Sequence, residues 1–160
     1  PPGDPPFLRE LAHYEWIELA LSVDPREPAA GAGDGPSPDP DGDLLEQVPV
    51  LSPLAWPVAY RWPVHRIGPD YRPAEPPEQP TYLMVYRDRD DQVGFLEMNP
   101  VTARLVELLG AEAPATGRAI LAGIAAELGH PRPEVVIAGG LDILRDLRSR
   151  DIVVGTRPAA

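Results

Sequence analysis

The stretch TYLMVYRDRDDQVGFLEMNPVTARLVELLG, residues 81–110, decides the fold. A run of strand-forming residues passes through an acidic segment at 88–91 and returns as a second apolar run at 93–98, which predicts an antiparallel hairpin. Asn99 then stands where a helix cap belongs, and Pro100 occupies the first helical position, where its missing N–H costs nothing. The stretch therefore predicts a hairpin that leads directly into a capped helix ending at Gly110.

Two more helices are predicted downstream of this unit. Thr116 is a candidate cap for a helix that ends at Gly129, and a third helix is expected from about Pro133 to Arg150. Residues 152–154 make a short last strand. We therefore expect an α+β fold containing a winged-helix-like module, a small antiparallel sheet with three helices.

Another helix is predicted at residues 7–23, FLRELAHYEWIELALSV, and it carries two apolar stripes. One stripe consists of Leu8, Ala12, Trp16, Leu19 and Val23, and the second of Phe7, Leu11, Tyr14 and Leu21, with Ile17 between them. A helix that is apolar over so much of its circumference is usually buried on more than one side. We favour the interpretation that this helix belongs to the core of an upstream domain; the alternative is that one stripe docks a partner protein.

The chain divides into three regions by composition. Residues 24–43 are mostly Pro, Gly, Ala and Asp and predict a flexible linker without a core. It separates the N-terminal helix in residues 1–23 from the main domain, which we place at residues 44–160. Because the first residue is proline, we expect the chain to be part of a longer product.

Charge and composition narrow the class of function. The net charge is −11, and the excess of acidic residues lies entirely in residues 1–98, so binding of nucleic acid is not expected. Cysteine is absent, which excludes disulfides, thiolate metal sites and a cysteine nucleophile in this chain. No apolar run has the length of a membrane span and no signal peptide is visible, so we expect a cytoplasmic protein without a membrane partner.

No group of residues in the sequence predicts catalysis or metal binding. His13, His65 and His130 lie far apart and lack metal-ligand spacing. Gly139-Gly140 falls inside the third helix, where it costs stability unless another part of the chain comes close, and it is too poor a pattern for a phosphate loop. We therefore expect no catalytic residues, no metal site and no cofactor in this chain.

A winged-helix module has two familiar uses in binding. The first is insertion of a helix into the DNA major groove, but acidic residues neutralise the arginines of the third helix. The second is pairing of a peptide with an exposed strand edge, beside which its side chains fill a groove next to a helix. For this use we predict a peptide site formed by strand 93–98 and the third helix, with the residues Val93, Gly94, Phe95, Leu96, Glu97, Leu141, Arg145 and Arg148.

Two resemblances extend this interpretation. The segments RDDQVGFLEMNPVTARLVELL, TGRAILAGIAAEL and HPRPEVVIAGGLDILRDLRSRDIVV resemble, in their order, the PqqD-like recognition elements of peptide-modifying pathways. The segments FLRELAHYEWIELALSV, VPVLSPLAWPVAYRWPVHRIGPDY, PTYLMVYRDRDDQV and MNPVTARLVELL are similar to the C-terminal part of HvfC-type proteins. The second resemblance covers nearly everything outside the linker.

The resemblance implies an accessory subunit without an active site of its own. HvfC-type proteins, like the similar MbnC-type subunits, pair with a multinuclear iron oxidase that converts cysteines of a ribosomal precursor peptide into copper-binding groups. By this likeness the partner holds the iron, and this chain binds the leader of the precursor. Two alternatives remain open: a winged-helix transcription regulator, and an interaction domain that supports the oxidase without touching the precursor.

Overall fold

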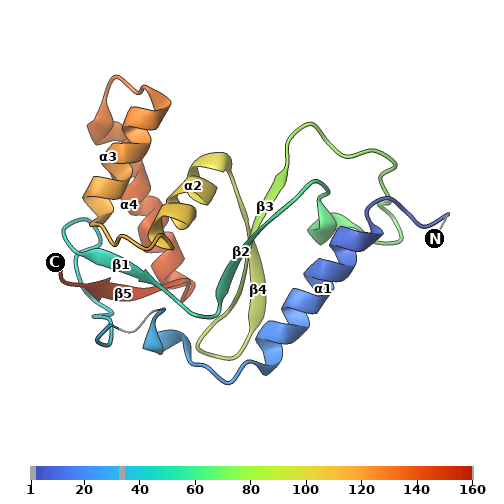
Figure 1. The fold of residues 1–160 in the computed structure, drawn as a ribbon, viewed down its shortest axis with the longest axis horizontal. Coiled ribbons are helices and arrows are strands. Elements are labelled where there is room, and N and C mark those ends of the chain that lie inside the picture. Colours follow the sequence, from blue (N-terminus) through green and yellow to red (C-terminus); the bar gives the residue numbers. More distant parts are fainter. Residues whose placement is uncertain (1–2, 33–34, 160) are drawn as a thin grey trace.

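The computed structural model describes residues 3–32 and 35–159 of the chain. These residues form an α+β fold with four α-helices and two small antiparallel sheets, as predicted for the fold class (Figure 1). Helix α1, Leu8–Val23, lies on one side of the larger sheet, and helices α2 to α4 lie on the other side (Figure 1). The finer winged-helix assignment stays a prediction.

The larger sheet contains the predicted hairpin. Its strands are β2 (Ala55–Tyr60), β3 (Thr81–Arg87) and β4 (Val93–Met98), antiparallel in the order β2-β3-β4. The acidic turn is built by Asp88, whose side chain accepts hydrogen bonds from the N–H groups of Asp90 (2.9 Å) and Gln92 (3.0 Å). The prediction of a hairpin at residues 81–98 is confirmed.

The three helices after the hairpin lie where they were predicted, and the first two begin and end at the predicted cap residues. They are α2 (Pro100–Leu109), α3 (Gly117–Leu128) and α4 (Pro133–Ser149). Asn99 accepts a hydrogen bond from the N–H of Thr102 at 2.8 Å, and Thr116 accepts one from Ala119 at 3.2 Å. Gly129 ends α3 with a positive φ of 63°, a conformation that glycine adopts without strain.

The second sheet joins distant parts of the chain. Strand β1 (Val48–Leu51) pairs antiparallel with β5 (Val153–Arg157), the strand predicted at 152–154. The described part of segment 24–43 contains the short 3-10 helix η1 (Pro28–Ala30) and then runs beside β5, where Asp39 and Thr156 exchange backbone hydrogen bonds of 2.8 and 2.9 Å. Side chains of Arg87, Arg148 and Arg157 donate further hydrogen bonds to carbonyls of this segment, and its role as a flexible linker stays a prediction.

The two faces of the larger sheet belong to two separate cores. We call the side packed by α2, α3 and α4 the helical face and the opposite side the α1 face. Along β3, Met84 faces the helical face while Leu83 and Val85 face α1, and all three are fully buried. On the α1 face, the short 3-10 helix η2 (Val64–Arg66) completes the packing.

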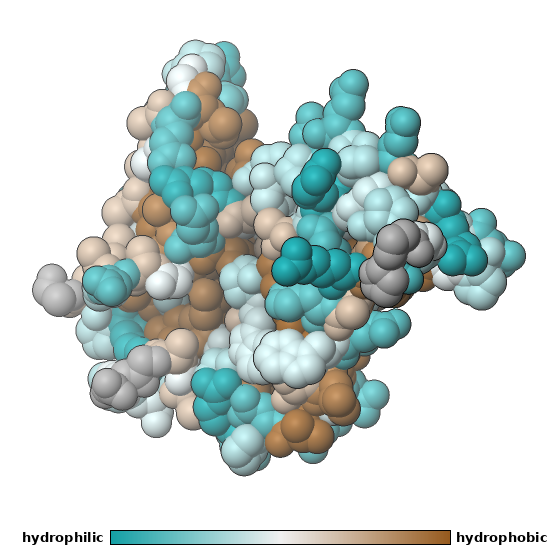
Figure 2. All heavy atoms as spheres, turned by 45° about the vertical axis from the view of Figure 1, so that its right-hand side comes forward, coloured by the Kyte–Doolittle hydropathy of each residue, from teal (hydrophilic) through white to brown (hydrophobic). Residues whose placement is uncertain are grey.

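Helix α1 packs within this chain, which differs from our favoured expectation for it. Its inner residues Phe7, Tyr14, Ile17 and Leu21 are buried against the sheet. The outer stripe is exposed at Leu8, Trp16, Leu19 and Val23. Figure 2, in which this side of the molecule comes forward, shows apolar surface among hydrophilic side chains. One of the two predicted stripes is therefore core of this domain, and the other faces outward.

Polar contacts hold α1 in place at both of its ends. Near its N-terminus, Glu10 accepts hydrogen bonds from the backbone N–H groups of Arg61 (3.1 Å) and Trp62 (2.9 Å). At its C-terminus the guanidinium of Arg87, a residue only 5% exposed, donates to the carbonyls of Leu21 (2.6 Å), Asp24 (2.7 Å) and Arg26 (2.7 Å). A cation at helix carbonyls satisfies acceptors that the helix leaves unpaired. These contacts fix α1 relative to the strands.

Candidate functional site

Strand β4 is an edge of the larger sheet. The backbone N–H of Asp88 donates to the carbonyl of Gln92 at 3.0 Å, and the N–H of Arg87 donates to Leu54 on the opposite side at 3.1 Å. Hydrogen-bonded pairs in an antiparallel ladder recur at every second residue, so Gly94, Leu96 and Met98 bond to β3. The backbone groups of Val93, Phe95 and Glu97 therefore point away from the sheet, and no other described strand pairs with them.

An open cavity of about 580 Å³ borders this edge. One wall comes from α1, with Tyr14, Glu15 and Glu18, another comes from η2, and the third is the first half of β4 with Phe95. Side chains alternate along a strand, so Val93, Phe95 and Glu97 point to the α1 face. A chain laid beside β4 would place alternate side chains against the same face.

Aromatic rings form the apolar part of this cavity. The rings of Tyr14 and Phe95 meet edge to face with centroids 6.5 Å apart, and those of His65 and Phe95 are 5.5 Å apart. Phe95 is nevertheless 46% exposed. Burial, together with the neighbouring carboxylate of Glu18, raises the pKa of Tyr14 to about 12, so its hydroxyl stays protonated.

A small hydrogen-bonded network adjoins the cavity at His65. Glu97 on β4 contacts the ring Nε2 of His65 at 3.1 Å and accepts a hydrogen bond from Arg66 at 3.0 Å. Partial burial opposes ionisation of Glu97, but the hydrogen bond from His65 and the charge of Arg66 hold its pKa below the usual value. The Glu97 carboxylate therefore keeps the His65 ring fixed beside β4.

The structure separates the predicted site residues into two groups. Val93, Gly94, Phe95, Leu96 and Glu97 form the edge strand, and the first three line the cavity. On α4, Leu141 is half-buried on the helical face, Arg145 is exposed with Asp142 at 3.6 Å, and Arg148 donates to the carbonyl of Gly42 at 2.9 Å. Helix α4 packs chiefly on α3 and β5, whereas α1 and α2 are the helices packed on β4. A peptide-binding role for these residues stays a prediction.

Most of the residues that line the cavity were not singled out as site residues from the sequence, among them Tyr14, Glu15, Glu18 and His65. The signal for the two glutamates was present, because they lie on the narrow polar face of the helix at 7–23. Their placement beside β4 depends on contacts between residues far apart in the chain, and the sequence pattern does not reveal those.

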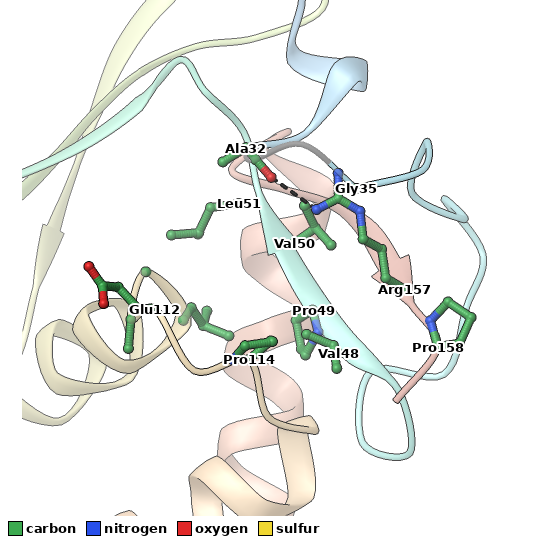
Figure 3. A pocket seen from close by; sticks show the side chains of 13 residues that line it. Ala32, Gly35, Val48, Pro49, Val50, Leu51, Glu112, Pro114, Arg157 and Pro158 are labelled. Carbon is green, nitrogen blue, oxygen red and sulfur yellow. Dashed lines mark hydrogen bonds between the residues drawn. The ribbon is translucent and has the colours of Figure 1, made fainter. Parts of the chain in front are cut away.

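A second cavity, of about 530 Å³, lies between β1 and the turn at residues 110–114. Its walls are mostly apolar, and Glu112 and Arg157 lie at opposite ends (Figure 3). Arg157 is tied by hydrogen bonds to the carbonyls of Ala32 (3.0 Å) and Pro36 (2.7 Å). The lining of the cavity includes Ala32 and Gly35, the last described residue before a gap in the description and the first one after it, and we propose no site there.

The histidines have separate partners in the fold. His13 contacts the hydroxyl of Tyr60 at 2.8 Å, and His130 accepts a hydrogen bond from the N–H of Arg132 at 3.0 Å. Among residues 3–32 and 35–159, no three His, Asp or Glu side chains gather as a metal-ligand set. Within the same ranges, none of the helices has the length and apolar character that crossing a bilayer requires.

A protein-family model relates this chain to known proteins. No curated protein matches the chain. The family model described as the HvfC C-terminal domain matches residues 52–148, a span that includes β2, β3, β4, α2, α3 and nearly all of α4. The match bears out the HvfC-type resemblance and does not extend to the PqqD-like and MbnC-type likenesses, which stay predictions. Since it covers more than half of the sequence, the chain belongs to the HvfC C-terminal domain family.

Proposed function

We propose that this chain is a non-catalytic accessory subunit that binds the leader of a ribosomal precursor peptide along β4 and presents the precursor to a multinuclear iron oxidase in the cytoplasm. The oxidase holds the iron and converts cysteines of the precursor into copper-binding groups. Family membership supports the accessory role. The observation that carries the peptide-binding role is the unpaired edge of β4, which borders an open cavity.

A peptide strand is the occupant that suits such an edge. The outward N–H and C=O groups of Val93, Phe95 and Glu97 would each gain a backbone partner, and the cavity would receive alternate side chains. Unprotected edges invite aggregation, so proteins usually cover or interrupt them. In this chain Glu97 places a charge on the edge, while the apolar residues Val93 and Phe95 remain beside the cavity.

Replacement of Phe95 tests the pairing. Proline at this position removes an outward N–H and leaves the ladder to β3 intact, because proline is tolerated on the open side of an edge strand. We expect Phe95→Pro to weaken binding of the synthetic leader at least tenfold relative to Phe95→Ala, which removes the ring but keeps the N–H. Equal affinities of the two variants in fluorescence anisotropy would contradict strand pairing.

Reconstitution tests the accessory role. The chain, the oxidase and the precursor are combined, and mass spectrometry follows modification of the precursor cysteines. We expect modification only when the chain is present, and a loss of modification with Phe95→Pro. Full modification by the oxidase alone would contradict the proposal.

The DNA-binding alternative has no observation in its favour. The arginines of α4 already have partners: Arg148 bonds to Gly42, Arg150 to Asp146 at 3.0 Å, and Arg145 lies beside Asp142. A gel shift with duplex DNA at low salt is expected to show no complex.

A further inference from the structure

We infer that the cavity beside β4 receives a lysine or arginine side chain of the peptide that pairs with this strand. The inference rests on the proposed function and names the chemistry that the peptide must carry. It follows from the polar atoms of the cavity, from its aromatic walls and from the direction of side chains along β4.

Helix α1 contributes two carboxylates to the cavity and no basic side chain. Glu15 is exposed and Glu18 is half-buried, and both belong to the α1 wall. No arginine is among the residues that line the cavity, and Arg66, the cation nearest in sequence to His65, is paired with Glu97. Besides burial, the charge of Glu18 helps to raise the pKa of the Tyr14 hydroxyl, which places this carboxylate close to the Tyr14 side chain. The cavity therefore holds negative charge and lacks a partner cation.

His65 adds an unused hydrogen-bond acceptor. Its side chain is only 4% exposed and lines the cavity, and its Nδ1 has no hydrogen-bond partner among the described residues. The Glu97 carboxylate can only accept, so the proton between them belongs to Nε2 of His65. In the neutral ring Nδ1 is then an acceptor, and a buried acceptor without a donor is costly. Because Nδ1 is closed off from solvent, a ligand can supply this donor only if the His65 ring turns toward the cavity.

The aromatic walls select an organic cation with an apolar stem. Lysine and arginine lay their methylene groups along apolar surface and keep the charged end among polar groups. Phe95, which is exposed, offers ring surface for the stem and for the cation; the buried ring of Tyr14 lies behind it, and Glu15 and Glu18 lie on the same wall as Tyr14. A peptide strand on β4 directs every second side chain to this face, so one basic residue at the correct register meets all these groups.

Selection from a random peptide library tests the inference on the whole chain. Displayed 12-residue peptides are selected on the immobilised protein, and the selected sequences are compared with those obtained on Glu15→Gln/Glu18→Gln. We expect lysine or arginine to be enriched at one position of the wild-type set, with about tenfold weaker binding of these peptides to the double variant. The double variant Glu112→Gln/Glu134→Gln, which makes the same change in net charge outside the cavity, is expected to bind them as the wild type does.

A competition experiment distinguishes a basic side chain of a paired peptide from a free amine. Free lysine amide is added at the concentration that half-saturates the best peptide, and we expect it not to displace that peptide. Displacement at that concentration would show a site for free amines and overturn the inference.

The remaining outcomes separate the inference from the proposed function. Peptides that bind wild type better than Phe95→Pro, but carry no enriched basic residue, would overturn the inference and leave strand pairing standing. If the wild type selects no peptide that binds it better than Phe95→Pro, both the inference and the proposed strand pairing are contradicted.

Discussion

The two faces of the larger sheet are built in different ways. The helical face is covered by α2, with α3 and α4 packed behind it in the same core; all three helices follow the hairpin directly in the chain, and α2 and α3 begin at local cap residues. The α1 face is covered by a helix that precedes its strands by more than thirty residues, and polar contacts of Glu10 and Arg87 hold it there. The cavity lies on the α1 face. The helical face, which depends on neighbouring residues in the chain, is therefore core only. The α1 face, which brings distant segments together, contains both core and the proposed binding surface.

The largest effect is expected at Arg87. In Arg87→Met the stem can stay buried, but the carbonyls of residues 21, 24 and 26 lose their donor. We expect a loss of about 3 to 4 kcal/mol in the free energy of unfolding, measured with urea, because several acceptors are left unpaired together. The control Arg104→Met removes an exposed arginine that pairs with Glu127, and its stability should be nearly unchanged. Similar midpoints for the two variants would show that Arg87 does not hold α1.

The two sides of α1 should respond differently to truncation. Ile17 is 4% exposed and Leu19 is 63% exposed. We expect Ile17→Ala to cost about 2 to 4 kcal/mol, because it leaves a cavity against the sheet, and Leu19→Ala to change stability by less than about 0.5 kcal/mol. Thermal and urea unfolding measure both variants. A large loss from Leu19→Ala would mean that the outer stripe is covered in the free protein.

On the helical face, the glycine pair of α4 gives a matched test. A Cβ on Gly140 would meet the side chain of the buried Leu121 on α3, whereas a Cβ on Gly139 would meet nothing within 4 Å. We expect Gly140→Ala to cost about 1 to 3 kcal/mol through overpacking. Gly139→Ala should instead stabilise the protein by about 0.5 to 1 kcal/mol through helix propensity. Equal changes in the unfolding midpoint would contradict the close approach of α3 and α4.

The smallest effect is expected at Asp151, which ties the end of α4 to the hairpin. Burial opposes its ionisation, but hydrogen bonds from the side chain and the N–H of Arg89 hold its pKa below 3.8. A lowered pKa stabilises the fold above about pH 4, and this contribution is lost as the pH falls through the folded-state pKa. Asn tolerates the positive φ of 64° here, so Asp151→Asn should cost about 1 kcal/mol at neutral pH.

Urea unfolding of both proteins as the pH is lowered checks the assignment. The difference in stability between wild type and Asp151→Asn should shrink below about pH 4, where the wild-type carboxylate becomes protonated. A difference that stays constant down to the lowest pH at which the protein folds would contradict the role of the charged Asp151.

The sequence predicted the helical face well and the α1 face poorly. The hairpin and the caps at Asn99, Thr116 and Gly129 were predictable because each depends on neighbouring residues. The location of α1 was not, since it depends on partners far along the chain, such as the carbonyls bound by Arg87. An arginine that ends an apolar strand was the one visible signal of that contact.

For the candidate site, the edge strand was predictable from the sequence and the helix beside it was not. The edge strand was predicted from the apolar run at 93–98, and β4 has no second partner strand among the described residues. The expected neighbour, α4, lies against α3 and β5, because Leu144 and Leu147 bury its apolar side in the helical-face core. The cavity beside β4 is instead completed by Tyr14, Glu15 and Glu18 of α1, whose register with the strand is a tertiary property.

Amide hydrogen exchange, measured residue by residue by NMR with and without the precursor leader, tests the central claim most directly. The outward N–H groups of Val93, Phe95 and Glu97 are open in the free chain, while Gly94, Leu96 and Met98 already bond to β3. Strand pairing predicts that the leader slows exchange at least tenfold at the first three positions and changes the other three much less. Unchanged exchange at Val93, Phe95 and Glu97 in the presence of saturating leader, or new protection confined to α4, would contradict it.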